Sequence, residues 1–181
     1  MTVDVVRVGE LRCNCYVLKK GNDVLVIDPG DETDKIISMI GDNKLVGIII
    51  THYHFDHIGA VDDLVEKYNT SVYDINNMFE GDNSIRDFKF QVIYTPGHKE
   101  DSISIYFCED KIMFTGDFLF KNTVGRCDLP GGNILDMMKS IDKIKKYRGV
   151  LVYPGHGDST NIDDEIENNI YFKDSSILLK D

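Results

Sequence analysis

Three of the protein's five histidines and one carboxylate fall within six consecutive positions: His52, His54, Asp56 and His57. Imidazole and carboxylate are the usual protein ligands for zinc, iron and related ions. The apolar, β-branched run before them, residues 45–50, predicts a buried strand, and the run after them has helical spacing. In an extended backbone residues two apart point the same way, so His52 and His54 can approach one ion. Where the helix begins, Asp56 and His57 can reach a second point nearby.

The two remaining histidines and a further aspartate follow the same logic. His98 and His156 each come after an apolar, strand-like run and a Pro-Gly turn, and Asp117 comes shortly after another such run. No histidine is left over, whereas background histidines would also be scattered over surface helices. The pattern therefore predicts a metal site that is assembled at the ends of strands.

This pattern resembles the metallo-β-lactamase superfamily of dinuclear hydrolases, on His52-x-His54-x-Asp56-His57 followed in order by His98, Asp117 and His156. Within that superfamily it is most similar to the glyoxalase II branch, the hydroxyacylglutathione hydrolases and their short bacterial relatives. True β-lactamases of this fold commonly lack the histidine found here at position 57. The supporting segments are Asn14-Cys15-Tyr16, Ile27-Asp28-Pro29-Gly30, Gly125-Arg126-Cys127-Asp128-Leu129-Pro130-Gly131-Gly132 and Tyr153-Pro154-Gly155-His156-Gly157.

The resemblance implies how the ligands divide between two divalent ions, with zinc expected and iron or manganese as alternatives. The implied division is His52, His54 and His98 for the first ion, Asp56, His57 and His156 for the second, and Asp117 as the bridge. A metal lowers the pKa of bound water from about 15.7 to about 7, which provides a hydroxide nucleophile at neutral pH. Hydrolysis of a thioester such as S-lactoylglutathione suits this chemistry, because a thiolate leaves readily. Asp56 could ligate, hydrogen-bond to the hydroxide, or do both.

Four further residues keep two interpretations each. By resemblance Arg126 lies in a loop that lines the pocket, where it could pair with a substrate carboxylate; alternatively it ties the loop down. Asp28 resembles a position under the metal site that orients a ligand, or it simply forms a turn. Tyr53 and Phe55 could flank the mouth of the site or pack against the protein.

Two other functions compete with hydrolysis. In the first, a persulfide dioxygenase of the same fold, a single iron would take His52, His98 and Asp117, two histidines and one carboxylate with positions open for oxygen. The second is a non-catalytic metal-binding or scaffold role. The complete set of seven ligands favours the dinuclear hydrolase over both.

The composition of the chain limits the classes of partner that it can bind. The chain has 181 residues, with 42% hydrophobic and 28% charged residues, and its formal net charge of −11 disfavours nucleic acid, which needs clustered Lys and Arg. No signal peptide and no transmembrane run of about 18 apolar residues is recognisable. The four cysteines form no paired framework, which favours reduced thiols and a cytoplasmic location. We therefore expect a small-molecule substrate, and the sequence leaves the oligomeric state open.

The elements that must position these residues fall into two sets. Residues 2–28 predict three antiparallel strands, followed by a helix at 34–40, the strand at 45–50 and a helix at 58–68. Residues 76–87 are polar and predict an exposed connection. A second set of strands and helices follows. We expect its strands at residues 88–94, 102–107, 111–114 and 150–153, and its helices at residues 133–147 and 162–172.

Two sets of strands, each followed by helices, favour a layered α/β arrangement. The resemblance implies the same: a four-layer αβ/βα sandwich of two mixed sheets flanked by helices, as one domain over residues 1–181. Full-length glyoxalase II enzymes continue into a helical domain that holds glutathione, and we expect none here. Beyond His156 the only cations are Lys173 and Lys180. We therefore expect an open site with little selectivity for a glutathione moiety.

Overall fold

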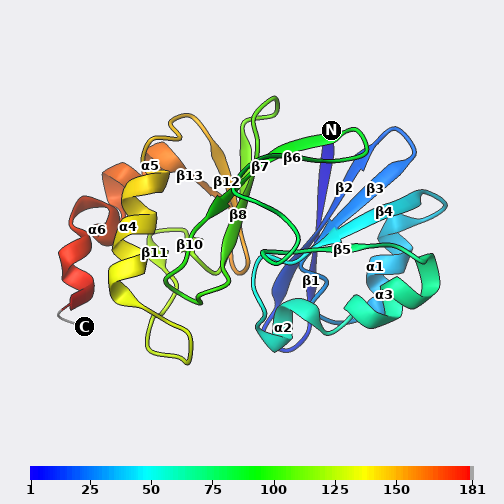
Figure 1. The fold of residues 1–181 in the computed structure, drawn as a ribbon, viewed down its shortest axis with the longest axis horizontal. Coiled ribbons are helices and arrows are strands. Elements are labelled where there is room, and N and C mark those ends of the chain that lie inside the picture. Colours follow the sequence, from blue (N-terminus) through cyan, green and yellow to red (C-terminus); the bar gives the residue numbers. More distant parts are fainter. Residues whose placement is uncertain (180–181) are drawn as a thin grey trace.

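The N-terminal half of the chain forms a mixed five-stranded sheet, in the order β1-β2-β3-β4-β5. Its strands are β1 (Thr2–Val8), β2 (Cys13–Lys20), β3 (Asp23–Ile27), β4 (Lys44–Ile49) and β5 (Val72–Tyr73). The first three pair antiparallel, whereas β3, β4 and β5 pair parallel. Figure 1 shows the arrangement in a computed structural model, which describes residues 1–179. Lys180, one of the two cations noted above, lies outside the described residues.

Three helices belong to this half: α1 (Thr33–Ile40), α2 (Phe55–Ile58) and α3 (Val61–Tyr68). The prediction for residues 34–40 is confirmed. The single helix expected over residues 58–68 is wrong, because the chain breaks between α2 and α3. The reason is close packing: a Cβ added to Gly59 would stand 2.3 Å from the carbonyl oxygen of Gly30, and the next amide donates to a loop carbonyl rather than along a helix.

The C-terminal half forms a six-stranded sheet, in the order β13-β12-β9-β8-β7-β6. Its strands are β6 (Gly81–Ile85), β7 (Phe88–Tyr94), β8 (Ile103–Phe107), β9 (Ile112–Gly116), β12 (Leu151–Pro154) and β13 (Thr160–Asn161). Only β9 and β12 pair parallel among these strands. The exposed connection predicted at residues 76–87 is wrong in part, because β6 pairs with β7 along its length. As an edge strand with one exposed face, β6 tolerates the polar residues that hid it.

A small hairpin, β10 (Leu119–Phe120) and β11 (Thr123–Val124), follows the larger sheet, and three helices cover that sheet. Asn133 is the N-cap of α4 (Ile134–Ile144), where its side chain accepts a hydrogen bond from the first-turn amide of Asp136. The closing helix expected over residues 162–172 divides into α5 (Ile162–Asn168) and α6 (Ile170–Lys173). Asn169 lies at the break, where its side chain caps α6. A 3₁₀ turn, Ser175–Leu179, ends the described chain.

Three hydrophobic clusters hold the layers together. One lies between the sheets and is rich in aromatic residues, including Tyr16, Phe88 and Phe114. The second packs α1 and α3 on the first sheet, and the third packs α4, α5 and α6 on the second. This is the predicted four-layer sandwich, and Figure 1 shows the helices at its two outer faces.

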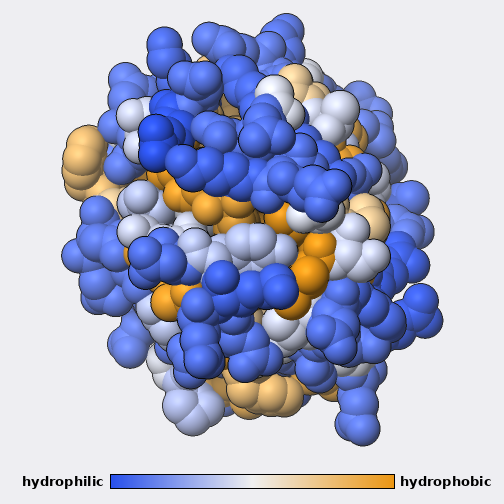
Figure 2. Space-filling model, turned by 90° about the vertical axis from the view of Figure 1, so that its right-hand side faces the viewer, coloured by the Kyte–Doolittle hydropathy of each residue, from blue (hydrophilic) through white to orange (hydrophobic). Residues whose placement is uncertain are grey.

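The outer surface is consistent with this layering. Figure 2 views the molecule from the side of α1 and α3 and shows a mostly hydrophilic face, with hydrophobic residues visible between the polar ridges. Among residues 1–179, no helix has the length and apolar character needed to cross a bilayer. All four cysteines are free, as predicted.

Candidate metal centre

One loop of the N-terminal half carries four of the predicted ligands. β4 ends at Ile49, and His52 and His54 lie in the segment after it, with extended backbone at His54. Asp56 and His57 lie in the single turn of α2, and His57 is fully buried. The strand-to-helix junction expected from the sequence therefore places the two pairs at successive points of one loop.

The C-terminal half contributes one candidate from each of three strand ends. His98 follows β7, Asp117 directly follows β9, and His156 follows β12. Because β9 and β12 are parallel neighbours, their carboxyl ends meet at one edge of the sheet. There the amide of Gly155 donates to the carbonyl of Gly116, 2.8 Å away, which brings the two loops together.

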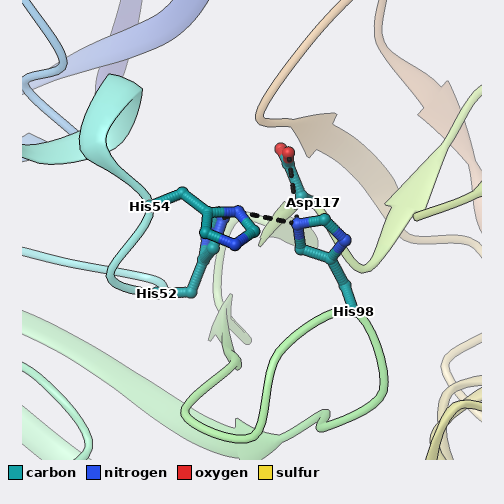
Figure 3. A group of neighbouring side chains, drawn as sticks. All are labelled: His52, His54, His98 and Asp117. Atoms are coloured by element: carbon teal, nitrogen blue, oxygen red, sulfur yellow. Dashed lines mark hydrogen bonds and ion pairs between the residues drawn. The ribbon is translucent and has the colours of Figure 1, made fainter. Parts of the chain in front are cut away.

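The first group comprises His52, His54, His98 and Asp117 (Figure 3). His54 Nδ1 lies 3.1 Å from His52 Nε2 and 3.0 Å from His98 Nε2, and Asp117 Oδ2 lies 3.6 Å from His98 Nε2. A tetrahedral ion about 2 Å from each nitrogen leaves about 3.3 Å between neighbouring ligand atoms. The observed spacing matches that of a single ion between these side chains.

The second group comprises Asp56, His57 and His156. Asp56 Oδ2 lies 3.1 Å from His156 Nε2 and 3.7 Å from His57 Nε2. Asp117 stands between the two groups, with Oδ1 3.3 Å from His57 Nε2 and Oδ2 towards His98. Both Asp117 Oδ1 and His57 Nε2 are buried without a hydrogen-bond partner. Two buried polar atoms left unpaired side by side are costly, and a cation between them would satisfy both.

Hydrogen bonds on the outer side fix which ring nitrogens face inward. His98 donates from Nδ1 to the carbonyl of Arg126 at 2.8 Å, and His156 donates from Nδ1 to the carbonyl of Leu11 at 3.0 Å. A carbonyl can only accept, so in the neutral form of each ring the proton is on Nδ1 and Nε2 presents a lone pair. Lone pairs converging without protons between them are what a metal ion requires.

Asp28 orients two more imidazole rings, that of His57 directly and that of His52 through Thr51. Its side chain, 2% exposed as a residue, accepts from the amide of Thr51 at 2.8 Å, from Thr51 Oγ1 at 2.6 Å and from His57 Nδ1 at 2.9 Å. Since the Thr51 hydroxyl donates to Asp28, it accepts from His52 Nδ1, 3.1 Å away. The orienting interpretation of Asp28 therefore fits this geometry. Asp28, His52 and His57 also lie close enough to hold an ion, but the oxygens of Asp28 already have donors.

The charge state of the site follows from burial and from the carboxylates. Burial, followed by the neighbouring imidazoles, lowers the pKa of His52 and His54, which keeps them neutral and able to ligate. Burial opposes a charge on His57, but Asp28 and Asp117 outweigh it and raise the pKa of His57 well above its usual value. The two carboxylates thus stabilise a positive charge at His57. A divalent cation bound there would supply that charge in place of the proton.

Two glycines allow the groups to approach. A Cβ on Gly155 would stand 2.2 Å from Asp117 Oδ1 and 2.7 Å from His57 Cε1. One on Gly125 would stand 1.9 Å from the carbonyl oxygen of Asp117 and 3.0 Å from His98 Cβ. Glycine is therefore needed at both positions, because these loops pass directly over the candidate ligands.

The structure places Arg126 beside the centre, with its side chain turned outward. The guanidinium is exposed and forms a paired contact with the carboxylate of Asp128, with both N···O distances 2.6 Å. This pairing holds the pKa of Asp128 at about 2 and offsets the charge that a substrate carboxylate would meet. The backbone carbonyl of Arg126 supports His98, and this role does not depend on the side chain.

Of the two interpretations left open for Tyr53 and Phe55, contact with the protein fits Tyr53, and a place at the mouth of the site fits Phe55. The Tyr53 hydroxyl donates to the carboxylate of Asp74, and burial together with that hydrogen bond raises the pKa of Tyr53 to about 12. Tyr53 is therefore tied to the protein. Phe55, in contrast, is 75% exposed beside Asp56, so its ring is available at the mouth of the site.

Three positioning contacts were not found from the sequence. Two are backbone carbonyls, those of Leu11 and Arg126, which any residue type can supply and which leave no signature. The third is Thr51, whose place directly before the first histidine could have been noticed, because a hydroxyl there can bridge a buried carboxylate and an imidazole.

Comparisons of sequence and of structure with known proteins point to one family. The chain matches the family model described as the metallo-beta-lactamase superfamily over residues 8–76 and 79–156. It is 31% identical to the "Probable metallo-hydrolase YqgX" of Bacillus subtilis, over 94% of this chain and 97% of that protein. It is 26% identical to "Hydroxyacylglutathione hydrolase GloC" of Haemophilus influenzae, over 97% of this chain and the whole of that protein. The structure titled "TTHA1623 in a di-iron-bound form" superposes with a TM-score of 0.86 and 30% identity, over 93% of this chain and all of that chain.

Proposed function

The chain belongs to the metallo-beta-lactamase superfamily, and from that premise we propose that it is a dinuclear metal-dependent hydrolase acting on thioesters. One observation carries the proposal: two groups of inward-facing ligand atoms share Asp117, whose unpaired Oδ1 faces the unpaired Nε2 of His57. In the proposed division of ligands, His52, His54 and His98 hold one ion, Asp56, His57 and His156 hold the other, and Asp117 contacts both.

The metal ions, when bound, supply a water of lowered pKa and polarise a substrate carbonyl. The chain itself holds the ligands in place. Asp28 and two backbone carbonyls keep protons on the outer nitrogens of the rings, so that the inner nitrogens need no rearrangement before binding. Asp56, which borders the hollow at the mouth, has lone pairs to accept a proton beside the substrate.

A thioester is the substrate class that we favour. Its thiolate leaves without protonation, and neither a serine nor a cysteine nucleophile is needed at such a centre. The printed name of the Haemophilus relative, a hydroxyacylglutathione hydrolase, agrees with this choice. S-lactoylglutathione and smaller thioesters are accordingly the first substrates to test.

Oxygen chemistry is the second candidate, and the first group favours it. His52, His98 and Asp117 alone form a two-histidine, one-carboxylate set suited to iron. Under this alternative, the second group would play no catalytic part. The unpaired inward nitrogen of His57 argues for the dinuclear proposal, because a site for one iron gives that atom no partner.

The deciding experiment combines stoichiometry with activity. The purified chain would be loaded separately with zinc, iron and manganese, analysed for metal by mass spectrometry, and assayed against thioesters, esters and lactones. We expect two ions per chain and thioester hydrolysis. One ion at saturation, together with oxygen uptake on glutathione persulfide, would replace the proposal with the dioxygenase.

A further inference from the structure

The loop between β1 and β2, Gly9–Arg12, lies directly against the second ligand group. Its Leu11 carbonyl accepts the hydrogen bond from His156 Nδ1. Its tight geometry places Arg12 at a φ of 56°, with the Arg12 amide donating to the carbonyl of Gly9 at 3.1 Å. A long side chain in this left-handed region is uncommon. The loop Gly9–Arg12 therefore forms part of the wall of the site.

The loop borders a hollow of about 370 Å³, which is lined by Arg7, Arg12, His156 and Asp158 among others. Arg7 is neutralised by Asp158, with an N···O distance of 3.0 Å. The guanidinium of Arg12, in contrast, has no hydrogen bond or ion pair within residues 1–179. In a chain of net charge −11, an unpaired arginine shares a hollow with a candidate metal ligand.

The loop also borders a second hollow of about 390 Å³, which reaches Asp56. Leu11 borders both hollows, and Phe55 borders this one; the two side chains are 55% and 75% exposed. The remaining charged residues of its lining are the carboxylates Glu10 and Asp31. An anion is therefore repelled here, whereas an uncharged carbon chain finds apolar contact.

We propose that the loop Gly9–Arg12 sorts the substrate by charge: Arg12 binds a carboxylate of the substrate, and the uncharged part crosses Leu11 and Phe55. This inference rests on the proposed function and refines it, because the preferred substrate becomes an anionic thioester. It also departs from the expectation of little selectivity for a glutathione moiety, which considered only Lys173 and Lys180 beyond His156. The required cation precedes the histidine motif in sequence and reaches the site through the β1–β2 turn.

The test compares Arg12→Gln with Arg86→Gln. Arg86 is an ideal control, because it is exposed, lies at a similar φ of 53°, and borders neither hollow. The substrates are three thioesters: S-acetyl-N-acetylcysteamine, its S-glutaryl analogue with the charge on the acyl half, and S-acetyl-3-mercaptopropionate with the charge on the thiol half. The two charged compounds show which half of the substrate meets Arg12.

We expect Arg12→Gln to lower kcat/KM for one charged thioester about three- to tenfold, mainly through KM, and to leave the neutral thioester within about twofold. Added salt should weaken the wild-type preference for the charged substrate and leave the variant unaffected. Arg86→Gln should match the wild type. An equal loss on charged and neutral substrates would overturn the proposal and show a merely structural role, as would no loss on any of them.

The same variants separate this inference from the proposed function. Wild-type turnover of the neutral thioester supports the hydrolase whatever Arg12 does. Absence of turnover on all three compounds overturns thioester hydrolysis, and the subsite is then decided by calorimetric titration of the zinc-loaded protein with glutarate. Weaker glutarate binding by Arg12→Gln than by Arg86→Gln supports the anion subsite, and equal binding refutes it.

Discussion

The two halves of the sandwich contribute to the centre in different ways. The N-terminal half presents four candidate ligands from one short loop, so their relative places are set by local backbone geometry. The C-terminal half presents His98, Asp117 and His156 from three strand ends, and only the pairing of β7, β8, β9 and β12 brings them together. The first arrangement can be read from adjacent residues, whereas the second depends on the whole sheet.

This difference has a physical consequence. Ligands in one loop remain close even when packing loosens, so we expect the N-terminal group to tolerate a damaged scaffold. Ligands from separate strands are held by long-range contacts, such as the hydrogen bond between the loops after β9 and β12. Asp117, which contacts histidines of both halves, is the point where the two arrangements meet.

Removal of Asp117 should have the largest effect. We expect Asp117→Ala to bind at least one ion fewer and to lower kcat/KM by about a thousandfold or more, because both groups lose a shared anionic ligand. The fold should persist, since the change also removes a buried carboxylate. Metal content, thioester kinetics and circular dichroism would check this. Asp62→Ala, on an exposed face of α3, is the control and should be silent. Similar losses from both would mean that the site lies elsewhere.

Asp28→Asn breaks the comparison on the N-terminal side. Asparagine tolerates the left-handed φ of 51° at this position, so the backbone is retained. Its amide would donate to His57 Nδ1, which moves the ring proton to Nε2 and blocks that nitrogen. The same oxygen of Asp28 accepts from Thr51 Oγ1, so the amide also disturbs the contact that orients His52. We expect affinity for both ions to fall, by about 10- to 100-fold for the ion that His57 would hold.

Competitive zinc titration of Asp28→Asn would resolve the two binding steps. Asp62→Asn serves as the control, because it removes the same charge from an exposed helix face. Weakening of a single step would show that Thr51 keeps His52 in place without Asp28. Unchanged titration would show that His57 is oriented by something else.

The sequence predicted the parts of this molecule that depend on local pattern. The strand before His52, the Pro-Gly turns before His98 and His156, and the four-layer architecture could all be inferred from apolar runs and turn residues, with the family resemblance. The break at Gly59 could not, because it comes from contact with Gly30 in a distant loop. β6 was missed since an edge strand needs few apolar residues.

For the candidate site, residue type predicted which side chains converge but not what surrounds them. The pairing of Arg126 with Asp128 depends on the path of one loop, which residue type and spacing do not determine. Arg12 and His156 line one hollow although they are 144 positions apart along the chain (156 − 12), and no local sequence pattern encodes such a contact. Backbone acceptors were invisible for the same reason.

The smallest effect on chemistry is expected from Glu165→Gln, which tests the scaffold of the C-terminal half. Glu165 is fully buried, and its carboxylate accepts from the amide of Asn122 at 2.9 Å, from Thr160 Oγ1 at 2.6 Å and from Asn169 Nδ2 at 2.7 Å. It thereby ties α5 to the turn of the β10–β11 hairpin, between Asp117 and the Arg126 loop. Glutamine keeps one acceptor oxygen and replaces the other by an amide donor, so the three donors, now shared between two oxygens, are left with one acceptor.

That mismatch should lower the free energy of unfolding by about 1–3 kcal/mol, the cost of leaving a buried polar group unpaired. Metal content should remain unchanged and kcat/KM should stay within about threefold, because Asp117 is placed by β9 and not by the hairpin. Urea unfolding and metal analysis would measure both quantities, with Glu167→Gln on the exposed face of α5 expected within about 0.5 kcal/mol of the wild type. If Glu165→Gln instead lost an ion without losing stability, the hairpin would be part of the centre, and the C-terminal ligands would depend on more than their strand ends.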